Sequence, residues 1–110
     1  MKSEDKEIIE KALEEVLTPH MFDMISYRLV YEIKDKFEHV LKEKLYYNEM
    51  CSRIRFHSKL DNNMDEDGTY KIVVSFSYMF ESPVNFSDLN ICFNTTYGEV
   101  CAYWTNCEKR

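Results

Sequence analysis

Residues 68–80, GTYKIVVSFSYMF, decide the fold because they predict one long and nearly uncharged strand. Lys71 is its only ionisable group apart from the tyrosines. The even positions from Tyr70 to Phe80 are all apolar, and side chains two residues apart lie on the same face of a strand. Such a strand is an aggregation hazard unless another element or a second chain covers it. The even face is therefore predicted to belong to the core.

Two interpretations of the odd face of this strand are open. The strand is either central and buried on both faces, or it leaves its own sheet and pairs with another chain. Polar residues on the odd face are not typical of a core, and the preceding connection, residues 61–68 (DNNMDEDG), exceeds the roughly two to five residues of a usual hairpin. The long connection allows the strand to leave its own sheet, and we predict that its odd face and its edge meet another chain. The predicted contact residues are Lys71, Val73, Ser75, Ser77 and Met79.

Two amphipathic helices are predicted before the strands. Apolar residues recur at helical spacing over residues 4–17, where Ser3 is the expected N-cap. The same spacing returns over residues 19–46, where Thr18 is the expected cap and Pro19 suits the first helical position.

After residue 48 the apolar period changes from about 3.6 to about 2, which indicates strands. The first strand begins near residue 50 and continues through Lys59. The third covers about 86–94, and a turn at 95–98 leads into the fourth, about 99–106. The order ααββββ predicts a single α+β domain over residues 1–110, with both helices on one face of a four-stranded antiparallel sheet.

The composition points to a folded, acidic protein. The chain has 110 residues, of which 45% are hydrophobic, and its net charge is −6. This charge argues against nucleic acid or an anionic membrane as the first partner. The N-terminal segment MKSEDKEIIEK lacks the apolar core of a secretory signal. We read the cysteines as reduced and expect a cytoplasmic location. They are Cys51, Cys92, Cys101 and Cys107.

Sequence patterns of catalytic and cofactor sites are not found, so we expect a non-enzyme without a metal or cofactor. Residues 63–68 (NMDEDG) match the start of a calcium loop, but Val74 stands where a calcium-binding glutamate is required. His20, His39 and His57 are scattered and are expected at the surface. A Cys–His enzyme stays an alternative, and it requires a thiol of low pKa.

A basic stripe marks the first strand. It consists of Arg53, Arg55, His57 and Lys59, which alternate with residues of the opposite face. One interpretation is a binding face for an acidic ligand or a nucleic-acid backbone. The other, which we favour, is internal pairing with the acidic connection 61–67 or with helix carboxylates.

The closing segment, residues 90–106 (NICFNTTYGEVCAYWTN), has an aromatic–Asn turn that leads into a Cys-containing strand. Together with IIEKALEEVL at 8–17, the ααββββ order and the element lengths, it resembles the Tctex-type dynein light chains over nearly the whole chain. The resemblance implies a cytoplasmic, cytoskeleton-associated, non-catalytic subunit of a microtubule motor complex. It implies a homodimer that exchanges its second strand. It also implies that a segment of the dynein intermediate chain or of a cargo adaptor binds by β-strand addition at the dimer interface.

Overall fold

The computed structural model describes residues 3–18, 25–46, 54–61, 66, 68–78 and 85–108. Two helices, α1 (Ser3–Val16) and α2 (Tyr27–Tyr46), precede four strands. The strands are β1 (Ile54–Leu60), β2 (Thr69–Tyr78), β3 (Asn85–Asn94) and β4 (Glu99–Glu108). They form one sheet in the order β1-β2-β3-β4, in which every neighbouring pair is antiparallel. The predicted α+β architecture is therefore confirmed.

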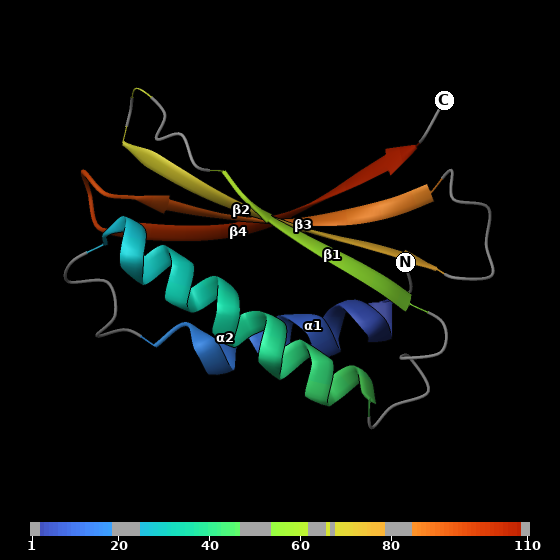
Figure 1. The fold of residues 1–110 in the computed structure, drawn as a ribbon. Coiled ribbons are helices and arrows are strands. Elements are labelled where there is room, and N and C mark those ends of the chain that lie inside the picture. The colour runs from blue at the N-terminus through green and yellow to red at the C-terminus, as the bar shows by residue number, and fades with distance from the viewer. Residues whose placement is uncertain are drawn as a thin grey trace.

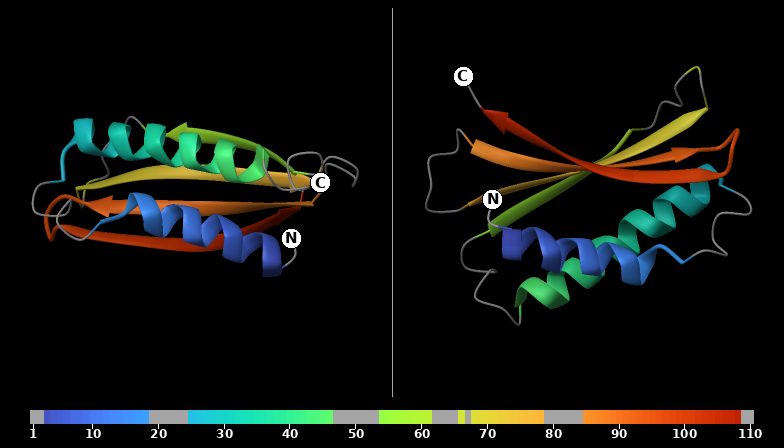
Figure 2. Two further views of the ribbon diagram at one scale, coloured as in Figure 1. Left: turned by 90° about the horizontal axis from the view of Figure 1, so that it is seen from below. Right: turned by 180° about the vertical axis from the view of Figure 1, so that it is seen from behind.

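Both helices lie on the same face of the twisted sheet (Figure 1). Seen from the helix side, α2 runs over the β1 and β2 side, and α1 runs over the β3 and β4 side (Figure 2, left). The opposite face of the sheet is not covered by any helix or strand of the described chain (Figure 2). This face is called the open face below.

The core lies between the helices and the covered face of the sheet. In the strand register Ile72 stands opposite Ile91, and Val74 stands opposite Leu89. All four side chains are at most 1% exposed, as the even-face prediction requires. Full burial of one such side chain contributes about 1.5–3 kcal/mol. The helices complete the core with Ile9, Ala12, Leu13, Val16, Val30, Ile33, Phe37 and Leu41.

Three side-chain contacts tie the helices to each other and to the sheet. Lys44 Nζ lies 2.8 Å from Glu15 Oε1 and joins α2 to α1. Trp104 Nε1 donates to Glu10 Oε1 at 2.9 Å and joins β4 to α1. Glu38 of α2 accepts a hydrogen bond from the hydroxyl of Ser58 in β1. The last two contacts agree with the placement of α1 beside β4 and of α2 beside β1.

The start of the second helix differs from its prediction. Ile25 and Ser26 are not helical, and α2 begins at Tyr27 rather than at residue 19. The physical reason is a cap: Ser26 Oγ accepts the Leu29 amide at 3.2 Å, and the Ser26 carbonyl accepts the Val30 amide at 3.0 Å. The predicted first residue, Pro19, lies outside the described residues, and the hydroxyl of the predicted cap, Thr18, is buried without a hydrogen-bond partner in the described part of the chain.

The strand β2 occupies an inner position in the single chain. It pairs with β1 from Ile72 to Tyr78 and with β3 from Thr69 to Ser77. The backbone amides and carbonyls of β2 therefore face a paired strand on both sides. We expected an edge of β2 to meet a second copy and then a peptide, but within the single chain β2 has no free edge. The inner position of β2 follows from its apolar even face. That face is buried most completely when the strands on both sides also direct apolar residues toward the helices. Exchange between two copies stays a prediction, since an exchanged β2 has the same neighbours.

Gly68, directly before β2, is required by its backbone and its surroundings. Its φ is +80°, and its carbonyl accepts hydrogen bonds from the Thr95 amide at 2.9 Å and the Thr95 hydroxyl at 2.8 Å. A Cβ at this position comes within 2.7 Å of Thr96 Oγ1 and 2.9 Å of Thr95 Oγ1.

We expect Gly68→Ala to lower the free energy of unfolding by roughly 2–4 kcal/mol, because left-handed strain and steric overlap add. Urea denaturation followed by circular dichroism measures this change. Gly98→Ala, at φ +65° in the turn after β3, is the comparison, with an expected loss of about 1–2 kcal/mol. Equal losses in the two variants contradict the close packing of Gly68 against Thr95 and Thr96.

Candidate functional site on the open face of the sheet

The strand register brings two predicted sets of residues onto one surface. On the open face, His57 of β1 stands opposite Ser75 of β2, and Lys59 stands opposite Val73. The basic stripe and the odd face of β2 are thus neighbours. Arg55 and Ser77 face each other in the register, but their side chains are outside the described residues, as are Arg53 and Met79. The two hypotheses from the sequence therefore concern a single site.

The two basic side chains described on β1 are directed away from the helices. His57 and Lys59 are exposed, while Phe56, Ser58 and Leu60 of the same strand turn toward the helix layer. The predicted pairing with helix carboxylates is therefore wrong for His57 and Lys59. Pairing with the acidic connection stays a prediction, because most of that connection lies outside the described residues.

A polar network occupies the centre of the open face. Ser75 Oγ donates to Asp88 Oδ1 at 2.5 Å across the β2–β3 pair. Asn90 is only 4% exposed, and its Nδ2 donates to Thr105 Oγ1 at 3.1 Å and to the Tyr103 carbonyl at 3.4 Å. The Asp88 carboxylate interrupts the positive surface formed by Lys59 and Lys71. The face is thus of mixed charge, which suits a protein partner better than a nucleic-acid backbone.

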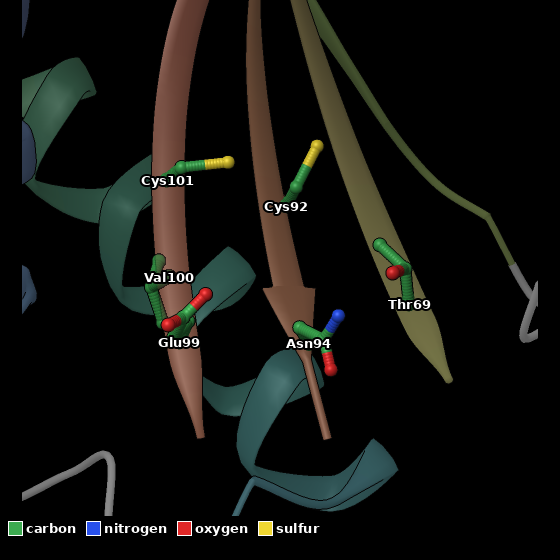
Figure 3. Close-up of a pocket in the computed structure, with 6 residues that line it drawn as sticks. All are labelled: Thr69, Cys92, Asn94, Glu99, Val100 and Cys101. Carbon is green, nitrogen blue, oxygen red and sulfur yellow. The ribbon is translucent and has the colours of Figure 1, made fainter. Parts of the chain in front are cut away.

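Two cysteines meet at the other end of this face. Cys92 of β3 stands directly opposite Cys101 of β4, and both are free thiols. They line an open hollow of about 430 Å³ together with Thr69, Asn94, Glu99 and Val100 (Figure 3). Figure 3 shows the Cys101 sulfur directed from β4 toward β3, and the Cys92 sulfur on the β2 side of β3.

Burial raises the pKa of the Cys92 thiol, and the neighbouring Cys101 raises it further, while the Lys71 ammonium acts in the opposite direction. Lys71 Nζ also lies 5.9 Å from the centre of the Tyr103 ring. The catalytic cysteine of a Cys–His enzyme needs a lowered pKa instead. The geometry at Cys92 thus does not favour the Cys–His enzyme considered from the sequence.

Two strand edges are open to a further strand among the described elements, those of β1 and β4. The β1 edge carries Arg55, His57 and Lys59 within seven residues, and charged side chains on an edge resist strand addition. The β4 edge has no charged residue from 100 to 107 (VCAYWTNC), and it exposes Ala102 and 45% of Tyr103. The β4 edge is therefore the better acceptor for another strand.

The cysteine pair and the β4 edge were missed in the reading of the sequence. The cysteine pair follows from one signal, the four-residue turn at 95–98. Once Asn94 is placed opposite Glu99, counting along both strands puts Cys92 opposite Cys101. The identity of the outer strands had no comparable signal, because strand order depends on contacts distant in sequence.

Other site types find little support in the described part of the chain. No group of three or more His, Cys, Asp or Glu side chains is arranged there to hold a metal ion. None of its helices is long and apolar enough to cross a membrane. Comparisons with protein-family models, curated proteins and solved structures gave no match. The resemblance to Tctex-type light chains thus stays a prediction, and the function is argued from the sheet.

Proposed function

We propose that this protein is a non-catalytic, homodimeric binding subunit that takes an extended segment of a partner protein as an additional β-strand. The partner implied by the Tctex-type resemblance is a segment of the dynein intermediate chain or of a cargo adaptor. In this account the segment pairs with the β4 edge, and its side chains reach the open face. The earlier expectation placed the segment at β2, whose two edges are already paired in the single chain.

One observation carries the proposal: a sheet covered by helices on one face only, with an outer strand that has no charged residue from 100 to 107. An edge strand presents unpaired amides and carbonyls, and an extended peptide satisfies them in β-strand addition. Alternate side chains of the added strand then face the open face, where Tyr103 and Thr105 lie. Backbone pairing supplies affinity in this mode, and side-chain contacts supply specificity.

The dimer is supported by the connections that flank β2. Eight residues (61–68) separate β1 from β2 and six (79–84) separate β2 from β3, whereas four (95–98) separate β3 from β4. A strand with two long connections can be exchanged with a second copy while every strand pair is kept. Light scattering at micromolar concentration should give twice the chain mass of 13.3 kDa. A monomer across this range would contradict the dimer while leaving strand addition at β4 to be tested separately.

We expect Val73→Asp to weaken dimerisation or peptide binding by at least about tenfold, which is roughly 1.4 kcal/mol. Val73 is half-buried at the centre of the open face, between Lys59 of β1 and Asn90 of β3. A carboxylate there places a second negative charge near Asp88 on the open face that we propose contacts the partner. Light scattering and fluorescence anisotropy with a labelled intermediate-chain peptide measure the two effects.

The matched control for Val73→Asp is Lys36→Gln, which makes the same change in net charge at an exposed position of α2. Circular dichroism establishes that both variants keep the fold. Unchanged mass and unchanged peptide affinity in folded Val73→Asp would exclude the open face of β2 from both contacts.

A further inference from the structure

The facing cysteines form a chemical site that strand addition does not use. Cys92 and Cys101 are direct register partners in neighbouring antiparallel strands. Such partners have Cα atoms about 4.5 or 5.5 Å apart, depending on the type of pair. Both separations lie within the roughly 4.4–6.8 Å over which a disulfide can join two cysteines. The register therefore satisfies the main distance requirement of a disulfide without a change in strand pairing.

The two thiols differ in access. Cys101 is exposed, and Cys92 is half-buried. The interaction of each thiol with the other contributes to the raised pKa of Cys92, which indicates that the two sulfurs are close. The hollow of about 430 Å³ leaves room for a small molecule at the sulfurs. The exposed Cys101 thiol is the one that a small disulfide can reach first. The half-buried Cys92 thiol lies beside it and can then displace the small thiol from Cys101.

We propose that Cys92 and Cys101 form a redox-active dithiol site that reacts with low-molecular-weight disulfides and closes to a reversible cross-strand disulfide. The Cys101 thiolate attacks one sulfur of the small disulfide, a mixed disulfide forms, and one small thiolate leaves. The Cys92 thiol then loses its proton and attacks the Cys101 sulfur, and the second small thiolate leaves. Two protein thiols are oxidised, one small disulfide is reduced to two thiols, and the two protons end on the released thiols.

Lys71 acts as a positioning residue for the second step. Its ammonium opposes the rise in the pKa of Cys92 and so favours the thiolate that closes the disulfide. Tyr103, whose ring lies 5.9 Å from Lys71 Nζ, holds that ammonium on the same side of the sheet. The reaction needs no part of the β4 backbone edge. A failure of this proposal would therefore not count against the proposed function, and a failure of the proposed function would not count against this proposal.

The test uses the full chain with Cys51→Ser and Cys107→Ser, so that Cys92 and Cys101 are the only cysteines. The protein is reduced, exchanged into glutathione disulfide under non-denaturing conditions, quenched with acid and weighed intact. We expect a loss of two hydrogens and no glutathione adduct. Cleavage after glutamate should then give a cross-linked pair of fragments, because Glu99 separates the two cysteines. Reduction with dithiothreitol should restore the starting mass.

Single variants in this background separate the two steps. Cys92→Ser should keep the glutathione adduct on Cys101. In the parent, disulfide closure should release glutathione at least about tenfold faster than it is lost from Cys92→Ser, because the neighbouring thiol acts at high effective concentration. Lys71→Met should slow closure, whereas Lys59→Met, on the same face but two strands from Cys92, should not. A stable adduct, an intermolecular disulfide or unreacted thiols in the folded parent would each overturn the proposal.

Discussion

Replacing Phe76 with alanine is expected to lower the free energy of unfolding by about 3–5 kcal/mol. Phe76 is 1% exposed at the centre of the covered face. Its ring centre lies 6.2 Å from that of Phe56 and 5.7 Å from that of Trp104, so one side chain connects strands β1, β2 and β4. Truncation leaves a cavity between these rings. Because small domains are stable by only about 5–15 kcal/mol, the loss is a large part of the total.

The control for Phe76→Ala is Tyr103→Ala, an aromatic truncation on the open face of the same sheet. Tyr103 is 45% exposed, and the hydrogen bond that it accepts from Asn90 uses its backbone carbonyl, which alanine retains. We expect a loss below about 1 kcal/mol for this variant. Urea denaturation followed by the circular dichroism of the sheet compares the two. Similar losses in both variants would mean that the two faces of the sheet are buried alike, against the structure.

Introducing a charge on the β4 edge is the second change with a large expected effect. Ala102→Lys should weaken binding of an extended peptide by at least about tenfold, because an edge lysine opposes the approach of another strand. Ala102 is exposed, so the substitution leaves the core intact. Isothermal titration calorimetry with the intermediate-chain peptide gives the change in Kd.

The control for Ala102→Lys is Glu14→Gln, which raises the net charge by the same amount on an exposed position of α1. It should bind as tightly as the parent chain. If Ala102→Lys binds normally, the peptide does not add to β4, and the β1 edge becomes the acceptor to examine.

Most of the fold could be predicted from apolar periodicity alone. Ile72 and Val74 in β2, and Leu89 and Ile91 in β3, all face the helices as their alternation indicates. The start of α2 was missed because Pro19 and Ser26 both carry helix-start signals, and only contacts in the folded chain show that Ser26 caps the described helix.

The site was only partly predictable, because it depends on which strands are neighbours. Periodicity correctly placed Lys71, Val73 and Ser75 on one face and His57 and Lys59 on one face of another strand. It did not show that these faces are the same surface. Nor did it show that the Ser75 hydroxyl donates a hydrogen bond to Asp88, since that contact joins two different strands. Strand order and register supply this information, and they are set by packing against the helices.

The central claim, that this chain binds an extended protein segment on its open sheet, is tested most directly by NMR. The uniformly ¹⁵N-labelled chain is titrated with an unlabelled peptide from a dynein intermediate chain. The account predicts saturable shifts that are largest at the amides of β4 and at open-face positions of β3, with the inner amides of β2 little changed. The absence of any saturable shift, or shifts confined to the exposed faces of α1 and α2, would contradict it.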